Sequence, residues 1–314
     1  MRQINYHLGV RKEYVNTKAQ NKIYVGDYLQ SLKVSKHATG TINKYKEQLE
    51  IFFSWNRKYN EDKDFTELKS KDFMNYFEHL RNLNLSQNRI KHSKSVLNSF
   101  SDCVERIYED TLPTYKNRVR SIDVGKAERT LEKTIINEDQ LKIILEDLKN
   151  TKQYQLACFL SLLANSGCRK SEVLQLTTDD FKNVVFDGKF YKTHTLRNKG
   201  KSFPRYIIKE GFEEYLNLWL EERKKNILSC KTNSLFLGAE GPALISTINS
   251  FTNSLNRKYN LNFYPHCMRH YFVSRLDSLG WSADMIQRLM NWSTPRMVQY
   301  YNDNSDEAIL NKYL

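Results

Sequence analysis

The chain of 314 residues has few cysteines and no long hydrophobic run. Its five cysteines are odd in number and scattered, and no two of them form a Cys-x-x-Cys pair. This pattern excludes a disulfide framework and is typical of a protein of the reducing cytosol. No stretch of about 18 apolar residues is present, and the N-terminal MRQINYHLGVRKEY lacks the apolar core of a signal peptide. We therefore expect a cytoplasmic protein with no membrane segment.

The charge balance favours a polyanionic partner. The chain has 49 basic and 36 acidic side chains, a formal charge of +13, and 40% of its residues are hydrophobic, which supports folded cores. The excess is distributed: residues 1–130 hold 24 basic and 16 acidic residues, and residues 131–314 hold 25 and 20. A basic surface in both halves points first to nucleic acid and second to an anionic membrane.

Two folded units and a linker are predicted from the residue pattern. Residues 1–24 are polar and basic and are interpreted as a leading segment. In residues 25–110, apolar residues recur at helical spacing, as in TINKYKEQLEIFFSW, which predicts an all-helical bundle. Residues 111–134 contain a Pro, a Gly and mixed charge without a period, which is typical of a linker. Residues 135–314 form the second unit.

The predicted third helix of the bundle, residues 85–108, is basic near its start. Ser86 is its expected N-cap, and the preceding helix within 65–82 is expected to start at Lys71 or Asp72. Three cationic residues on the third helix are candidate DNA contacts, although such a run is commonly just a solvated face: Arg89, Lys91 and Lys94.

The second unit is predicted to be mostly helical with one small sheet. Asn137 and Gln140 match a capping box, and YQLACFLSLLANSG predicts a buried helix that stops at Gly167. Between about 183 and 209, two turn signals separate β-branched and aromatic runs, which predicts a three-stranded antiparallel meander. Helices then resume to the end of the chain.

Four places in the second unit carry side chains suited to chemistry. SGCRKSE places Arg169 just after a helix end, and Lys199 lies in the second hairpin turn. In HCMRH, a helical spacing of i, i+3 and i+4 puts His266, Arg269 and His270 on one face. NWSTPRMVQYY places Trp292 nine residues before the second of two adjacent tyrosines, Tyr301.

Each place also has a plain structural interpretation. An arginine after a helix commonly caps carbonyls or pairs with an acid, here Glu172, and a lysine in a hairpin turn is commonly solvated. The aromatic residues can simply close the end of a core. A metal site on His266 and His270 would need a third ligand, and no His-Glu-x-x-His or second Cys/His cluster is present, so no metal is expected.

Taken together, the order and spacing of these residues resemble the tyrosine recombinase (phage integrase) family. The family's Ser-Gly-x-Arg-x-x-Glu box corresponds to SGCRKSE, with Arg169 and the supporting Glu172, and its hairpin lysine corresponds to Lys199 in NKG. Lys201, in the same turn, competes with Lys199 for that role and is also a candidate DNA contact. The N-terminal T-x-x-x-Y-x-x-x-L-x-x-F-x-x-W, residues 41–55, resembles the family's core-binding domain.

The rest of the constellation also matches. His-x-x-Arg-His is present as HCMRH, with His270 as a supporting residue, and Trp292 stands where the family has His or Trp, nine residues before the nucleophile, here Tyr301. Met290-Asn291-Trp292 departs from the frequent Leu-Gly-His, because Asn replaces Gly. The resemblance implies a mostly α protein: a core-binding (SAM-like) helical bundle and an α+β catalytic domain with a three-stranded sheet.

The resemblance also implies a reaction and partners. We expect a site-specific recombinase that cleaves and rejoins double-stranded DNA at paired core sites through a 3′-phosphotyrosine, without metal or other cofactor. Arg169 and Arg269 would hold the phosphate, His266 would assist Tyr301, Lys199 would protonate the leaving oxygen, and Trp292 would donate a hydrogen bond.

Assembly and biological role are further expectations. The protein is expected to be a monomer in solution and a homotetramer on DNA, in which residues 303–314 dock on a neighbouring copy. Accessory DNA-bending proteins are further candidate partners. When bound to DNA, the protein is expected at the bacterial nucleoid. A mobile-element integrase or resolvase is favoured. A Xer-like dimer resolvase, a non-catalytic DNA-binding regulator, a tyrosine-type topoisomerase and a metal-dependent nuclease are the alternatives.

Overall fold

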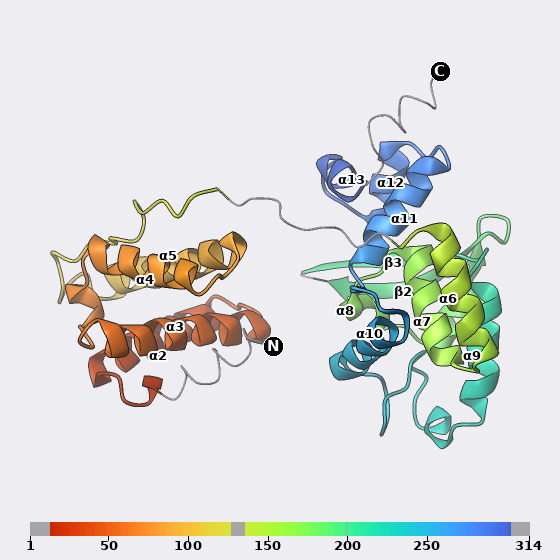
Figure 1. The fold of residues 1–314 in the computed structure, drawn as a ribbon, viewed down its shortest axis with the longest axis horizontal. Helices are drawn as coiled ribbons and strands as arrows, with labels where there is room; N and C mark the ends of the chain where they lie inside the picture. Colours follow the sequence, from red (N-terminus) through yellow and green to blue (C-terminus); the bar gives the residue numbers. More distant parts are fainter. Residues whose placement is uncertain (1–12, 127–135, 199, 303–314) are drawn as a thin grey trace. The chain divides into compact units, whose positions relative to one another are not determined.

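The computed structural model describes residues 13–126, 136–198 and 200–302. It divides the chain into two compact units, Met1–Leu131 and Glu132–Leu314, which are described separately (Figure 1). Lys199 and the C-terminal segment 303–314, both of which carry predictions, lie outside the described residues. Among the described helices, none is both long enough and apolar enough to cross a bilayer.

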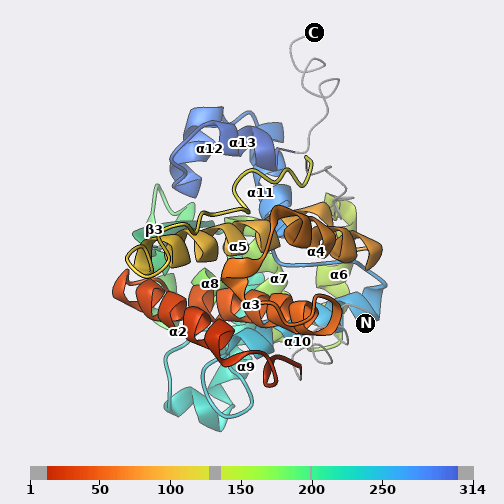
Figure 2. The same ribbon diagram turned by 90° about the vertical axis from the view of Figure 1, so that its left-hand side faces the viewer.

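In the described part of the N-terminal unit, helices α2 to α5 form a bundle in two layers (Figures 1 and 2). The first layer pairs α2 (Ala19–Val34) with α3 (Thr39–Tyr59). The second pairs α4 (Ser70–Asn82) with α5 (Gln87–Ile107), and a 3-10 turn, η1 (Phe65–Glu67), precedes α4. The apolar stripes of these helices meet in a core that is dominated by aromatic rings: Phe52, Phe53, Phe65, Phe73 and Phe100.

The predicted helical bundle is confirmed, and three of its details differ from the sequence-based expectations. Helix α2 begins at Ala19, inside the segment 1–24 that was interpreted as a leading segment. Helix α4 begins at Ser70, one residue before the expected start, because the Asp72 carboxylate accepts a hydrogen bond from the Lys69 backbone N–H at 2.7 Å. Ser86 is the N-cap residue of α5, but its side chain makes no capping hydrogen bond.

Part of the segment predicted to be a linker packs on the N-terminal unit. Tyr115 and Val119 are buried in its core, and Arg118 donates a hydrogen bond to the Leu68 carbonyl oxygen at 2.6 Å. Asn117 also binds the Asp102 carboxylate at 2.7 Å. The first half of residues 111–134 is therefore held against the helices.

The second unit is built around one helix that is buried on all sides. Helix α7 (Tyr154–Ser166) is flanked by α6 (Glu138–Asn150), α9 (Glu213–Lys224) and α11 (Cys267–Ser278). Every residue of α7 from Leu156 to Ser166 is buried. The predicted capping box at the start of α6 is present, with Asn137 and Gln140 bonding reciprocally. The predicted end of α7 at Gly167 is also confirmed.

The predicted three-stranded antiparallel sheet is confirmed. Its order is β1 (Val184–Val185), β2 (Phe190–Asn198) and β3 (Lys201–Ile208). A bulge between Lys192 and Thr195 shifts the register of β2 on β3. A short helix, α8 (Lys170–Val173), and a 3-10 turn, η2 (Thr178–Lys182), connect α7 to the sheet.

The C-terminal helices form a small core of their own. After α9 come η3 (Ile227–Cys230), α10 (Ile245–Tyr259), α11, α12 (Ala283–Met290) and α13 (Arg296–Tyr301). Helices α11, α12 and α13 pack together (Figure 1) around Phe272, Ile286, Val298, Trp292 and Tyr301. The two aromatic residues singled out in the sequence therefore do belong to a hydrophobic core.

Candidate active site

Gly167 forms the turn on which the site is built. Its φ of 56° lies in the left-handed region, where L side chains are strained. A Cβ at this position would also lie 2.9 Å from Phe272 Cδ1 and 3.1 Å from Met290 Cε. Glycine therefore satisfies two demands here, one of backbone conformation and one of space.

The same turn anchors Arg269. The Gly167 carbonyl oxygen accepts a hydrogen bond from Arg269 Nη1 at 2.7 Å, and the Arg269 side chain is fully buried. Its guanidinium also lies 5.1 Å from the Trp292 ring centre and 5.5 Å from the Tyr301 ring centre. The helix carrying HCMRH thus delivers its arginine to the end of α7, between the other predicted site residues.

Arg169 and Glu172 meet immediately after that turn. Glu172 is fully buried and accepts hydrogen bonds from the Arg169 backbone N–H at 2.9 Å and from Arg169 Nη1 at 3.1 Å. Asn198, the last residue of β2, donates to the same carboxylate at 2.6 Å. Burial alone would raise the pKa of Glu172, but the charge and hydrogen bonds of Arg205 and the Arg169 N–H outweigh it and lower the pKa to about 2.

Tyr301 faces the arginines and Tyr300 does not. The Tyr301 side chain is 5% exposed, and its hydroxyl lies 2.7 Å from His266 Nε2. Tyr300 is 48% exposed. The geometry thus distinguishes the two adjacent phenols and places Tyr301 against His266, while His270 packs on the Tyr301 ring at 4.7 Å between ring centres.

Burial raises the pKa of the Tyr301 phenol, and the positive charges of Arg269 and Arg169 oppose this rise. The phenol is therefore protonated at neutral pH, so a group that accepts its proton is needed before it can act as a nucleophile. His266 Nε2 is at hydrogen-bond distance and is suited to that task.

Trp292 stacks on Tyr301. The backbone conformation of Asn291, the residue before Trp292, explains why asparagine can replace the glycine of Leu-Gly-His. The two rings are 4.9 Å apart at 17°. Asn291 ends α12 with φ 50° and ψ 51°, in the left-handed region. Asparagine is the non-glycine residue that tolerates this conformation best, so the turn that presents Trp292 survives the change from glycine.

Several buried donors on these site residues lack acceptors. Within the described parts of the chain, Arg269 Nε and Nη2 and Trp292 Nε1 are buried and have no hydrogen-bond partner. Burial lowers the pKa of Arg269 to about 9, helped by the positive charges of Arg205 and Arg169. Buried donors without acceptors are costly, and an anion bound here would satisfy them. The site is therefore suited to an oxyanion such as a phosphate.

The structure brings together most of the predicted site residues. Arg169, Glu172, Arg269, Trp292 and Tyr301 surround one place. His266, the N-cap residue of α11, and His270, within α11, lie against Tyr301. Lys199 lies outside the described residues, and Lys201 begins β3 with an exposed side chain. Over the described residues, no three His, Cys, Asp or Glu side chains gather in a way that could hold a metal.

The predicted DNA contacts in the N-terminal unit do not share one face. On α5, helical geometry places Arg89 beside His92 on the flank next to α3, where His92 meets the Tyr45 ring at 6.3 Å. Lys91 and Lys94 lie on the opposite flank of the buried stripe. The three cations therefore belong to two separate edges of the helix.

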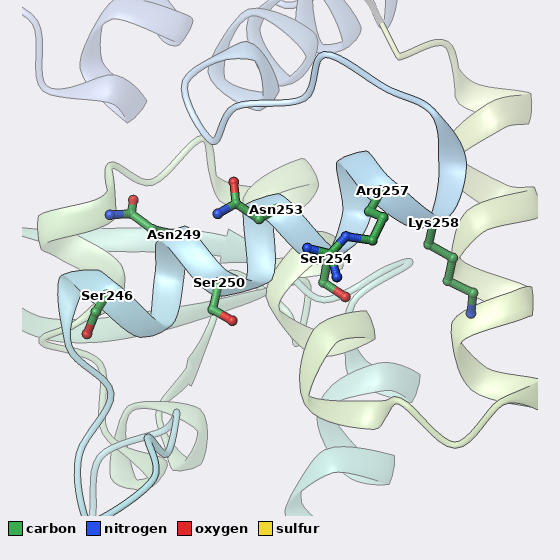
Figure 3. Close-up of a pocket in the computed structure, with 7 residues that line it drawn as sticks. All are labelled: Ser246, Asn249, Ser250, Asn253, Ser254, Arg257 and Lys258. Atoms are coloured by element: carbon green, nitrogen blue, oxygen red, sulfur yellow. The ribbon is translucent and has the colours of Figure 1, made fainter. Parts of the chain in front are cut away.

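A polar face on α10 was not singled out in the sequence. The face consists of seven exposed residues at helical spacing (Figure 3): Ser246, Asn249, Ser250, Asn253, Ser254, Arg257 and Lys258. The opposite face of α10 is buried through Ile248, Thr252 and Leu255. Lys170, the neighbour of Arg169, donates to Asn249 at 2.9 Å, which places this face beside the site.

Arg205 was also missed. It is fully buried and binds Glu172 with Nε and Nη2, each at 3.0 Å. On a strand with polar residues nearby, an arginine is normally predicted to point to solvent. Glu172, the glutamate of the arginine box, is the signal that could have predicted it. A carboxylate that is buried beside a backbone turn needs a cation held at a fixed place, and Arg205 supplies that cation.

The chain belongs to the phage integrase family, whose family model matches residues 134–308. Its relatives include proteins named tyrosine recombinases. It is 23% identical over 306 residues to tyrosine recombinase XerC of Oceanobacillus iheyensis, covering 94% of this chain and 96% of that protein.

Other relatives come from mobile elements. The chain is 27% identical over 190 residues to the SPbeta prophage-derived recombinase-like protein YomM of Bacillus subtilis, and that match spans 58% of this chain and only 57% of that protein. Among solved structures, the Tn1549 transposon integrase in complex with circular intermediate DNA has a TM-score of 0.69 at 19% identity, covering 93% of this chain and 99% of that chain. A lambda integrase dimer bound to a core site has a TM-score of 0.68 at 16% identity, with coverages of 90% and 77%. These structural likenesses establish the fold.

The Gly167 turn yields a stability prediction. We expect Gly167→Ala to lower the free energy of unfolding by about 2 kcal/mol or more, because it combines a left-handed φ with contacts to Phe272 and Met290. Gly188→Ala, at φ 82° but in open space, is the matched control and is expected to cost only about 1 kcal/mol. Denaturant unfolding of the two variants checks this, and equal losses would contradict the steric part of the argument.

Proposed function

We propose that this protein is a site-specific recombinase that cleaves and rejoins DNA through a covalent bond to Tyr301. The observation that carries the proposal is the buried phenol at 2.7 Å from His266, set against arginine and indole donors that lack acceptors. A DNA phosphate would accept hydrogen bonds from these donors, and the Tyr301 phenol lies beside them as the nucleophile.

The proposed reaction has two transesterifications. The Tyr301 oxygen attacks phosphorus while its proton passes to His266, and the bond from phosphorus to the 5′-oxygen breaks. Arg169 and Arg269 neutralise the charge that develops on the non-bridging oxygens, and the Trp292 indole N–H donates to one of them. Lys199 protonates the leaving 5′-oxygen, with Lys201 as the alternative acid. Attack by another 5′-hydroxyl on the 3′-phosphotyrosine then releases Tyr301.

Within this enzyme class we favour a mobile-element integrase or resolvase over a Xer-like resolvase of chromosome or plasmid dimers. The prophage-derived relative and the transposon integrase structure support the first, and near full-length similarity to XerC supports the second. The departure of Asn291-Trp292 from Gly-His tips the choice to a mobile element. Recombination of two copies of the same site by the purified chain alone, as opposed to recombination only with a second recombinase, separates the two.

The α10 face is the proposed base-reading surface. A helix fits the DNA major groove, and this one offers amide, hydroxyl and guanidinium groups with no acidic side chain among its lining residues. An asparagine amide can bond two edges of adenine at once. Asn249 accepts a hydrogen bond from Lys170, the residue after Arg169. Recognition of bases by this face would therefore determine which DNA phosphate lies at Arg169. In the N-terminal unit, Arg89, Lys91 and Lys94 are proposed phosphate contacts.

We also propose that residues 303–314 dock on a second copy when four chains assemble on two DNA sites. The sequence of this segment, DNSDEAILNKYL, has apolar residues at Ile309, Leu310, Tyr313 and Leu314. A groove of about 560 Å³ on the second unit is a suitable acceptor, with Phe190, Tyr206 and Trp281 in its lining. Phe186 stands at its edge, 61% exposed and at a φ of 53° that is costly for a bulky residue.

The nucleophile is tested by covalent capture on a nicked duplex that carries a site selected by binding from a random library. With EDTA present, the wild-type chain is expected to give a protein–DNA adduct in a denaturing gel. Tyr301→Phe removes the attacking oxygen and should abolish the adduct, while the matched Tyr300→Phe should keep it within about threefold. An adduct with Tyr301→Phe would move the nucleophile elsewhere, and dependence on a divalent metal would favour the nuclease alternative.

Base reading by α10 is tested with Asn253→Ala. We expect it to weaken binding to the selected site by about 1–3 kcal/mol while binding to unrelated duplex changes by less than about 0.5 kcal/mol, because base contacts carry specificity and phosphate contacts do not. Competition titrations at one fixed salt concentration measure both affinities. An equal loss on both duplexes would show that Asn253 contacts the backbone only.

Docking of the tail is tested by a chain that ends at residue 304. It should still form the adduct on a single site, but its complexes with two sites should stop at dimers in size-exclusion chromatography with light scattering. Phe186→Ser, in the acceptor groove, should give the same result with the tail intact. Normal recombination and tetramers from the shortened chain would exclude this role for the tail.

A further inference from the structure

The structure assigns a positioning role to Arg205. We propose that this residue binds the Glu172 carboxylate so that the Arg169 guanidinium is left to the DNA phosphate, and that it also fixes the end of α12 ahead of Trp292. The inference rests on the proposed function and adds a residue that does not itself touch the reacting atoms.

The contacts of Arg205 are those of a fixed structural cation. Its side chain is 1% exposed and that of Glu172 is 0% exposed. Nε lies 3.0 Å from Glu172 Oε2 and Nη2 lies 3.0 Å from Oε1, which is a two-bonded fork. The backbone N–H of Arg205, in β3, donates to Thr193 Oγ1 in the bulge of β2 at 2.8 Å. This hydrogen bond holds the backbone of β3 at Arg205 against β2.

This fork decides how Arg169 is used. A buried carboxylate needs compensation, and Arg205 supplies a full positive charge and two hydrogen bonds. Arg169 then contributes its backbone N–H and one Nη1 contact, while its side chain remains 29% exposed. Without Arg205, the nearest remaining cation for Glu172 is Arg169, and the carboxylate would draw that guanidinium away from the phosphate.

The third nitrogen of Arg205 reaches the segment that carries the aromatic site residues. Nη1 lies 3.3 Å from the backbone carbonyl oxygen of Met290, the last residue of α12. Asn291 and Trp292 follow at once. One side chain from β3 therefore joins the arginine box, the hairpin and the start of the segment that leads to Tyr301.

The test uses single-turnover cleavage of two duplexes that differ only at the scissile linkage, an ordinary phosphodiester or an uncharged methylphosphonate. On the phosphodiester we expect Arg205→Met to lower the cleavage rate by about 100-fold, the scale of losing one preorganised donor, with DNA affinity within about threefold. On the uncharged linkage, which needs less neutralisation by Arg169, the deficit should shrink to about tenfold or less.

Two further variants separate positioning from folding. Arg223, in α9, is another buried arginine of the same unit, and it donates to the Thr232 and Ser234 carbonyl oxygens, away from the site. Arg223→Met should lower the melting temperature but leave the cleavage rate per folded molecule unchanged on both linkages. If Arg205→Met does not fold, Arg205→Lys carries the test: it keeps the charge but not the fork, and we expect a loss of about tenfold on the phosphodiester only.

Four results would overturn the inference. Equal losses on the two linkages would indicate a general structural defect, and so would rates per folded molecule that fall as far in Arg223→Met as in Arg205→Met. Wild-type rates in the Arg205 variants would remove the role of Arg205 while leaving the proposed function intact. Absence of cleavage by the wild-type chain would overturn both.

Discussion

The buried carboxylate of Glu172 is the interaction on which the second unit depends. It joins the turn after α7, the end of β2 and the middle of β3, because Arg169, Asn198 and Arg205 all donate to it. A charge with no exposure to water is tolerated only when its partners are complete. With its pKa lowered to about 2, Glu172 is ionised at neutral pH, so its partners face a full negative charge.

The aromatic residues near the C-terminus serve packing, and under the proposed function they serve chemistry as well. Trp292 and Tyr301 complete the core of α11, α12 and α13, and the same stacked pair is the surface over which the Arg269 guanidinium lies. The plain and the functional interpretations of these side chains are therefore compatible. A nucleophile fixed in a core loses little freedom when it reacts, and this contributes to orientation.

The sequence predicted correctly the structural features that a few adjacent residues determine. The helix end at Gly167, the capping box at Asn137 and the two hairpin turns each follow from a few adjacent residues, and so does the face shared by His266 and Arg269. Arg205 depends on neighbours that are distant in sequence, which no periodicity reports, and so does the contact from Lys170 to Asn249 that places the α10 face beside the site. The start of α2 was missed because its apolar residues are interspersed with polar ones, and Asn21, a buried polar residue, holds the Phe65 N–H.

The contact between Tyr301 and His266 has a consequence for how cutting can be controlled. Both residues come from one chain, as do Arg169, Arg269 and Trp292, so each of these groups is already in place in a lone subunit. Under the proposed function, a neighbour need not lend any of these five groups. Control by assembly would then act on the entry of the DNA strand or on its alignment, so that nicking outside the assembly is prevented by withholding the strand from groups that are already in position.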